Sequence, residues 1–280
     1  MEIEDAFPKR PRDAHKRSVG TLAIVGGCPA FANAPAIAAL GARAAGAGLI
    51  QVVAPEETRF ALAVHVPEAT FRCISPDVEL PPADVTAFGM GLGLSDASLE
   101  LVARVVEGAK GRFVLDADAL NAVSRLYSGG LKPREGFESV ITPHEGEAAR
   151  LLGVKVEDVS LNREAAVRAL ASKYSATAVL KGPGTLVAAQ GEGPVWKCDL
   201  GNQFMALGGM GDLLSGMIAA RWAVLERAKV GGCRPAKAAK SAVWLHAKAA
   251  DDLVCGAEPV EASVLNVAAR AASIRTMLER

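Results

Sequence analysis

Short apolar runs alternate with longer amphipathic stretches along most of the chain. The apolar runs cover residues 21–25, 49–54, 85–88, 113–115, 140–142 and 177–180. Because these runs lack polar alternation, they are typical of strands that are covered on both faces. The stretches 34–45, 56–64, 97–109, 145–152 and 163–174 have the pattern of helices. This alternation predicts a mainly parallel sheet with helices on both sides.

The pattern changes after Lys181. Residues 185–189 and 195–198 predict a β-hairpin whose loop, 190–194, contains glycine. Three helices are predicted over 212–227, 236–253 and 262–278, with glycine and proline between them. The proline-rich stretch 75–82 is interpreted as a loop within the same domain, because neither a repeat nor a low-complexity linker interrupts the pattern.

Composition and charge narrow the class of protein. Half of the 280 residues are hydrophobic, which is enough for a large core, and the formal net charge is zero. A nucleic-acid partner is not expected, since such proteins usually present a basic face. No run approaches the ~20 apolar residues of a membrane helix, and residues 1–17 lack the apolar segment of a signal peptide. The five scattered cysteines contain no C-x-x-C pair, which favours reduced thiols in a cytoplasmic protein without a membrane partner.

Chemistry is concentrated where the predicted strands end. In an open parallel sheet, the ligand sits beyond the carboxyl ends of the strands. Those ends carry Gly26-Gly27, Gly89-Met90-Gly91, Asp116-Ala117-Asp118, Pro143-His144 and Lys181-Gly182. We therefore expect a single site along that edge of the sheet.

The turn Gly208-Gly209-Met210-Gly211-Asp212 opens an apolar helix. Glycines before a helix let backbone amides turn toward an anion, so the turn predicts phosphate binding. Asp212 is expected in the first helical turn, kept ionised by the helix dipole and able to act as a base. Taken alone, the turn fits a helix cap on a tight loop equally well. It is neither a Walker A motif nor a G-x-G-x-x-G motif, and the side chain of Met210 could face either the nucleotide or the core.

Three other strand-end segments each have a chemical and a structural interpretation. His144 is expected to face the crevice, while Glu147 could form a capping box with the threonine of Thr142-Pro143-His144 or bind a metal through water. Asp116 and Asp118 could orient a sugar hydroxyl or a hydrated Mg²⁺, or Asp118 could simply cap a helix. Lys181 could supply a point charge for phosphates or be a solvated lysine in a turn.

Taken together and in this order, the segments resemble the ADP/ATP-dependent NAD(P)H-hydrate dehydratases, a branch of the ribokinase-like superfamily. The resemblance covers the chain from about His15 onward. The segments that carry it are Asp116-Ala117-Asp118-Ala119-Leu120-Asn121, Thr142-Pro143-His144 followed by Glu147, Lys181-Gly182 followed by Thr185, the Gly208–Asp212 turn, and the helix segment from His246 to Asp251. It implies an α/β fold, a ribokinase-like three-layer αβα sandwich with a mainly parallel central sheet and a C-terminal helical segment. A single domain over 15–280 would follow a tail over 1–14.

The resemblance also implies an activity. Members use ADP or ATP to dehydrate the S epimer of hydrated NADH or NADPH back to NADH or NADPH, releasing AMP or ADP and phosphate. This is a metabolite-repair reaction that uses Mg²⁺. The absence of a targeting segment and the single domain, as in prokaryotic members, favour ADP over ATP. Assembly into a homo-oligomer, a dimer or a tetramer, and cooperation with a separate epimerase are expected of a relative.

Site residues are carried over at matching positions only. Asp212 matches the catalytic acid that contacts the hydroxyl, and Glu147 matches a position in the Mg²⁺ shell, bound through water. The substrate-binding positions are Ala34, Gly91, His144 and Asp212. The nucleotide-binding positions are Lys181, Gly182, Pro183, Gly184, Thr185, Gly208, Gly209 and Gly211. The chain departs from the family pattern at Arg17, Cys28, Asn33 and Met210.

Two other functions are weighed against this one. The first is a vitamin-alcohol kinase of the same superfamily, in which a cysteine often stands where Asp212 does. The second is a nucleotide sensor without catalysis, which the combination of Asp212 with a complete phosphate turn disfavours.

Overall fold

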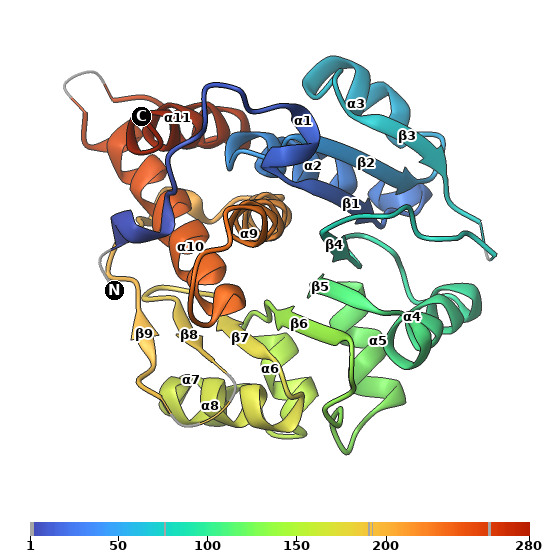
Figure 1. The fold of residues 1–280 in the computed structure, drawn as a ribbon. Coiled ribbons are helices and arrows are strands. Elements are labelled where there is room, and N and C mark those ends of the chain that lie inside the picture. The colour runs from blue at the N-terminus through green and yellow to red at the C-terminus, as the bar shows by residue number, and fades with distance from the viewer. Residues whose placement is uncertain (1–2, 76, 190, 192, 257–258) are drawn as a thin grey trace.

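The computed structural model describes residues 3–75, 77–189, 191, 193–256 and 259–280. Its centre is a nine-stranded sheet with the order β3-β2-β1-β4-β5-β6-β7-β8-β9 (Figure 1). The strands are β1 Thr21–Val25, β2 Leu49–Ala54, β3 Thr70–Cys73, β4 Val85–Phe88, β5 Gly111–Leu115, β6 Phe137–Ile141, β7 Thr177–Leu180, β8 Leu186–Ala188 and β9 Trp196–Lys197. The pairs from β3 to β7 are parallel, whereas β7–β8 and β8–β9 are antiparallel.

Helices cover both faces of the sheet. On one face lie α2 Ala34–Ala44, α3 Thr58–His65, α9 Met210–Arg227, α10 Arg234–Val254 and α11 Val264–Leu278; on the other lie α4 Asp96–Gly108, α5 Asp118–Leu126, α6 Glu145–Leu152, α7 Val156–Leu161 and α8 Arg163–Lys173 (Figure 1). Successive strand residues point to opposite faces: Val52 belongs to the first core and Val53 to the second. The expected three-layer sandwich with C-terminal helices is thereby confirmed.

The predicted elements are mostly found at the expected positions. Four strands, β1, β2, β4 and β7, have the predicted bounds, and the hairpin is formed by β8 and β9. Its loop was expected at 190–194, of which residues 190 and 192 lie outside the described residues. The edge strand β3 was not predicted, because its Thr-Phe-Arg-Cys sequence is largely exposed and carries no buried run. The short helix α7 was also missed.

Two glycines bring α2 and α9 into direct backbone contact. A Cβ atom on Gly41 would lie 2.1 Å from the carbonyl oxygen of Leu213, and one on Gly216 would lie 1.8 Å from that of Ala38. No larger residue fits at either position without moving a helix. The contact fixes the beginning of α9, and with it Asp212, relative to the sheet.

The N-terminal residues pack onto the helices through a buried arginine. Arg221 of α9 is fully buried and donates hydrogen bonds to the carbonyl oxygens of Ala6 and Ala45 and to Glu279. Its guanidinium carbon lies 4.2 Å from the centroid of the Phe7 ring, and burial is the main reason why the pKa of Arg221 is lowered to about 10. The segment described from residue 3 onward therefore belongs to the packed structure, although the division at residue 15 stays a prediction.

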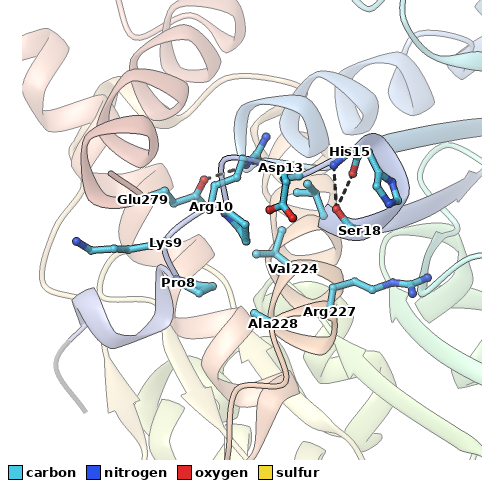
Figure 2. Close-up of a pocket in the computed structure, with 13 residues that line it drawn as sticks. Pro8, Lys9, Arg10, Asp13, His15, Ser18, Val224, Arg227, Ala228 and Glu279 are labelled. Atoms are coloured by element: carbon cyan, nitrogen blue, oxygen red, sulfur yellow. Dashed lines mark hydrogen bonds and ion pairs between the residues drawn. The ribbon is translucent and has the colours of Figure 1, made fainter.

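A hollow of about 530 Å³ lies beside this segment (Figure 2). It is lined by residues 8–11 and 13–15, by α1 Lys16–Val19, and by the end of α9. His15 and Ser18 bond to each other through their backbone and hydroxyl groups on its rim. Because α1 precedes β1, this hollow lies at the amino ends of the strands, away from the edge where we expect the site.

Two further expectations concern the class of protein. In the described part of the chain, none of the helices combines the length and the apolar character needed to cross a membrane. The five cysteines are free: Cys198 is buried, Cys28 is half-buried, and Cys73, Cys233 and Cys255 are exposed.

Candidate active site

Lys181 and Asp116 meet where β7 and β5 end. The Lys181 ammonium donates a hydrogen bond to Oδ1 of Asp116 at 2.7 Å, and Asp116 is only 1% exposed. Ser215 of α9 donates to the other oxygen, Oδ2, at 2.6 Å. Thr142, at the end of β6, places its hydroxyl 3.5 Å from that of Ser215. These contacts join three strand ends to the first turns of α9.

The backbone at Ala117 directs the two neighbouring acids to different partners. Ala117 has a φ of +50° and a ψ of −116°, a conformation that residues with a Cβ rarely adopt. Asp116 turns toward Lys181, whereas Oδ2 of Asp118 accepts a hydrogen bond from the amide of Gly93 at 2.8 Å. Ala117, not Asp118, is the N-cap of α5, so the capping interpretation of Asp118 was wrong.

The glycine turn and Lys181 face the same space. Gly209 has a φ of +91°, and α9 begins directly after it at Met210. A Cβ atom on Gly211 would lie 3.4 Å from the Nζ atom of Lys181, so the start of the helix and the ammonium group are neighbours. Both favour an anion there. Met210, whose position the sequence left open, is 6% exposed and packs in the core at the wall of the adjoining cavity.

Asp212, in the first turn of α9, is a carboxyl group that titrates near neutral pH. Burial is the main cause, and with the nearby Asp116 carboxylate it raises the pKa of Asp212 to about 7, although Lys181 acts in the opposite direction. Asp212 is therefore only partly ionised at neutral pH, which is less than the expected effect of the helix dipole would give. A group with this pKa can exchange a proton with a substrate at physiological pH.

Glu147 is a second buried carboxylate beside Lys181. It is 5% exposed, and Oε2 accepts a hydrogen bond from the His144 amide at 2.9 Å and lies 4.0 Å from the Lys181 Nζ atom. Burial raises the pKa of Glu147. Burial alone would lower the pKa of Lys181, but Asp116 and Glu147 raise it, so the lysine stays charged. The alternative of a solvated turn lysine was wrong.

His144 caps α6 and still reaches the surface of the site. Its Nδ1 atom accepts a hydrogen bond from the Gly146 amide at 3.0 Å, while the side chain is 55% exposed. The capping box therefore pairs Glu147 with His144, not with the threonine that was expected. With Nδ1 used as an acceptor, a neutral His144 carries its proton on Nε2, which lies 3.5 Å from Oε1 of Glu147.

Gly91 and Ala34 lie together at the neighbouring strand end. Gly91 has a φ of +64°, and a Cβ atom there would lie 2.7 Å from the Phe31 Cβ and 3.0 Å from the Ala34 Cβ. Ala34 begins α2, whose Ile37 side chain lies 2.8 Å from a Cβ placed on Gly209. The expected substrate positions are thus connected to the glycine turn through the first turn of α2.

A cavity of about 610 Å³ adjoins Lys181 and the start of α9. Its lining includes six of the expected nucleotide positions: Lys181, Gly182, Pro183, Gly184, Thr185 and Gly211. The lining does not include Gly208 or Gly209, which shape the turn. The rest of the wall comes from Met210 and Leu214 of α9, from residues 198–203, 205 and 206, and from α10. The sequence had assigned no site role to residues 198–206 or to α10.

Asp251 of α10 holds the loop that contains Gly201 and Asn202 in place. Its carboxylate accepts hydrogen bonds from the Gly201 amide and from Nδ2 of Asn202, both at 2.9 Å. The segment His246–Asp251 stood out in the sequence, but only the structure brings it together with Gly201 and Asn202.

Three carboxyl groups of the site, on Asp116, Glu147 and Asp212, are candidates for binding Mg²⁺. Among the described residues, no three His, Cys, Asp or Glu side chains are grouped closely enough to form a direct metal cage. However, Asp116, Glu147 and Asp212 all face Lys181, and Asp116 raises the pKa of both other acids. Mg²⁺ usually keeps several waters and binds through one or two carboxylates and substrate phosphates. The carboxylates present fit that kind of binding, and the role expected for Glu147, contact through water, stays a prediction.

Comparison with known proteins points to one family. The family model described as NAD(P)H-hydrate dehydratase matches residues 22–267. The bifunctional NAD(P)H-hydrate repair enzyme of Coxiella burnetii is 37% identical over 249 residues, which are 88% of this chain and 48% of that protein, so the chain spans about half its length. The ADP-dependent (S)-NAD(P)H-hydrate dehydratase of Neisseria meningitidis is 35% identical over 253 residues, covering 90% of this chain and 83% of the relative.

The three-dimensional structure is also similar to that of a member of this family. The crystal structure of the ADP/ATP-dependent NAD(P)H-hydrate dehydratase of Bacillus subtilis, co-crystallised with ATP and Mg²⁺, superimposes with a TM-score of 0.82. The match has 26% sequence identity and covers 98% of this chain and 96% of that one. The expected ribokinase-like fold is thereby confirmed.

Proposed function

Because the chain belongs to the NAD(P)H-hydrate dehydratase family, we propose that it dehydrates the S epimer of hydrated NADH or NADPH at the expense of ADP. The observation that carries the proposal is the position of Asp212, a carboxyl group with a pKa of about 7, beside Lys181 at the start of α9. That arrangement supports the proposal, because phosphoryl transfer to a hydroxyl group requires a base next to an anion site.

The proposed reaction has two steps, phosphorylation of the hydroxyl group and elimination of phosphate. The hydroxyl oxygen of the hydrated nicotinamide ring forms a bond to the terminal phosphorus of ADP, and AMP departs with the electrons of the broken phosphorus–oxygen bond. The ring carbon–oxygen bond then breaks, phosphate leaves with its electron pair, and a proton lost from the adjacent ring carbon leaves the new double bond. The sum is hydrated NADH and ADP giving NADH, AMP and phosphate.

The residues have separate roles in the first step. Asp212 accepts the hydroxyl proton, since its pKa of about 7 leaves it partly ionised at neutral pH. Lys181 and the amides at the start of α9 stabilise the charge on the transferring phosphoryl group. Asp116 positions Lys181 and Ser215 through its two bonds. Ala34, Gly91 and His144 would hold the hydrated ring.

Magnesium, when bound with the nucleotide, would neutralise phosphate charge, and Glu147 would hold it through a water molecule. Glu147 is suited to this because it is buried, bonded to the His144 amide and close to Lys181.

ADP is the proposed phosphoryl donor, with ATP as the second choice. The Neisseria relative is named as ADP-dependent, whereas the Bacillus relative is named as using either nucleotide. A separate epimerase would supply the S epimer from the other epimer. Assembly as a dimer or tetramer and a cytoplasmic location stay predictions.

The competing function is a vitamin-alcohol kinase. The two functions are separated by one set of parallel reactions with Mg²⁺ and ADP or ATP. Recovery of the absorbance band of reduced nicotinamide from S-epimer hydrated NADH supports the dehydratase. Phosphorylation of a thiazole or pyrimidine alcohol, without any recovery of that band, would establish the kinase and overturn the proposal.

A further inference from the structure

His246 is a buried polar side chain in the wall of the 610 Å³ cavity. It lies on α10 and is 6% exposed, and its Nε2 atom has no hydrogen-bond partner among the described residues. Buried polar atoms in folded proteins almost always have a partner. Nε2 itself is buried, but the residue lines the cavity, so an imidazole that lacks such a partner points to a group that binds in the cavity.

The imidazole is uncharged in this position. Burial lowers the pKa of His246 to about 4, so at neutral pH the ring has one N–H group and one bare nitrogen. Such a ring can both donate and accept a hydrogen bond. It does not attract phosphate as a cation, which distinguishes it from Lys181 in the same cavity.

The wall around His246 differs from the phosphate end of the cavity. Lys181 and Gly211 mark the phosphate end, whereas the wall near His246 is largely apolar: Leu200, Met205, Leu214, Val243 and Ala247. Apolar walls with a few placed polar groups are typical of sites that bind a flat organic ring. A cavity of about 610 Å³ lies within the size range of small-molecule sites.

The same helix also holds the facing loop. Asp251, five residues after His246, binds Gly201 and Asn202 of the loop that lines the cavity. In Figure 1, α10 passes between α9 and the β8–β9 hairpin, so one helix carries the histidine and fastens the opposite wall. Two hydrogen bonds thus hold the loop against the helix that carries His246.

We propose that His246 hydrogen-bonds the edge of the nucleotide's base and thereby selects the nucleotide. The inference rests on the proposed function, because it takes ADP as the occupant of the cavity. A site built around a buried hydrogen bond discriminates against ligands that cannot make it. His246 is accordingly a specificity-determining residue, outside the groups that take part in phosphoryl transfer.

The test compares ADP with inorganic pyrophosphate, which has the phosphates but no base. Binding of both is measured by calorimetry for the wild type, His246→Leu, His246→Gln and the control Ser241→Ala, whose hydroxyl donates to the Ala238 carbonyl oxygen within α10. We expect His246→Leu to weaken ADP binding about 3- to 10-fold, the range for one lost hydrogen bond. Pyrophosphate binding should stay unchanged, and His246→Gln should recover part of the ADP affinity. Ser241→Ala should match the wild type with both probes.

A measurement on the unaltered protein covers the case in which a substitution disturbs folding. The ring nitrogen resonances of His246, one of four histidines, should shift when ADP is added and stay in place with pyrophosphate. Unchanged resonances with bound ADP, or full ADP affinity in a folded His246→Leu, would overturn the inference and leave an internal water as the partner of Nε2.

The outcomes also separate the inference from the function it rests on. If the wild type regenerates NADH with ADP but His246→Leu keeps the same KM for ADP, only the role of His246 fails. If ADP binds through His246 but hydrated NADH is not converted, only the proposed function fails. If neither ADP nor ATP binds to the wild type, both fail.

Discussion

Lys181 donates a 2.7 Å hydrogen bond to Asp116, which joins the ends of β7 and β5 across 65 residues of sequence. The pair explains how a lysine stays charged in a buried position: the carboxylate raises its pKa against the effect of burial. It also links the phosphate end of the site to Asp212, because Asp116 raises and Lys181 lowers the pKa of that carboxyl group. The candidate site is thus a set of coupled charges on separate elements.

Removing one member of this pair should cost stability as well as nucleotide binding. Lys181→Met leaves the Asp116 carboxylate buried without its cation, so we expect a loss of roughly 3 kcal/mol in the free energy of unfolding. Urea unfolding measures the loss, and calorimetry with ADP measures the weaker binding. Asp116→Asn added to Lys181→Met should restore most of the stability but not the affinity. A Lys181→Met protein as stable as the wild type would show that the pair is not a buried ion pair in solution.

Asp212→Asn should fold normally and lose turnover. Because the amide cannot accept the hydroxyl proton, we expect kcat to fall by about 10²- to 10⁴-fold while the KM for ADP changes little. The matched control is Asp96→Asn, which alters an exposed acid in the first turn of another helix, α4, and should keep the wild-type rate. Near-normal turnover by the Asp212 variant would remove this residue from the mechanism.

The pH profile follows from the direction of the shift at Asp212. A base must be deprotonated, and burial raises the pKa of Asp212 to about 7. The value of kcat/KM for hydrated NADH should therefore rise about tenfold per pH unit below pH 7 and level off above it. Initial rates between pH 5 and pH 8.5 test this. A profile that is flat down to pH 5 would mean that the base has an ordinary carboxyl pKa.

Gly216→Ala should disturb the site from a distance. Its new Cβ atom would lie 1.8 Å from the Ala38 carbonyl oxygen, so α9 must move away from α2 and carry Asp212 with it. We expect a loss of about 1–3 kcal/mol in the free energy of unfolding and a lower kcat. Gly108→Ala at the end of α4, where a Cβ would meet nothing within 4 Å, is the control. Equal stability of the two variants would contradict the close helix contact.

The sequence predicted the parts of this site that lie directly after a strand in the chain. Buried strands such as β1 and β7 are short apolar runs, and the polar residues after them fall at one edge because the strands are parallel. Three features depend on packing and could not be read from the sequence: the raised pKa of Asp212, the unusual backbone of Ala117, and the cavity wall formed by α10 and residues 198–206. The edge strand β3 was missed because exposure replaces its apolar pattern with a polar one.

The most direct test of the proposed reaction is its stoichiometry. Purified protein is incubated with S-epimer hydrated NADH, Mg²⁺ and ADP, and the NADH, AMP and inorganic phosphate formed are measured in the same samples over time. The mechanism predicts equal amounts of all three products and no NADH when ADP is omitted. NADH formed without cleavage of the nucleotide, or AMP formed without NADH, would contradict it.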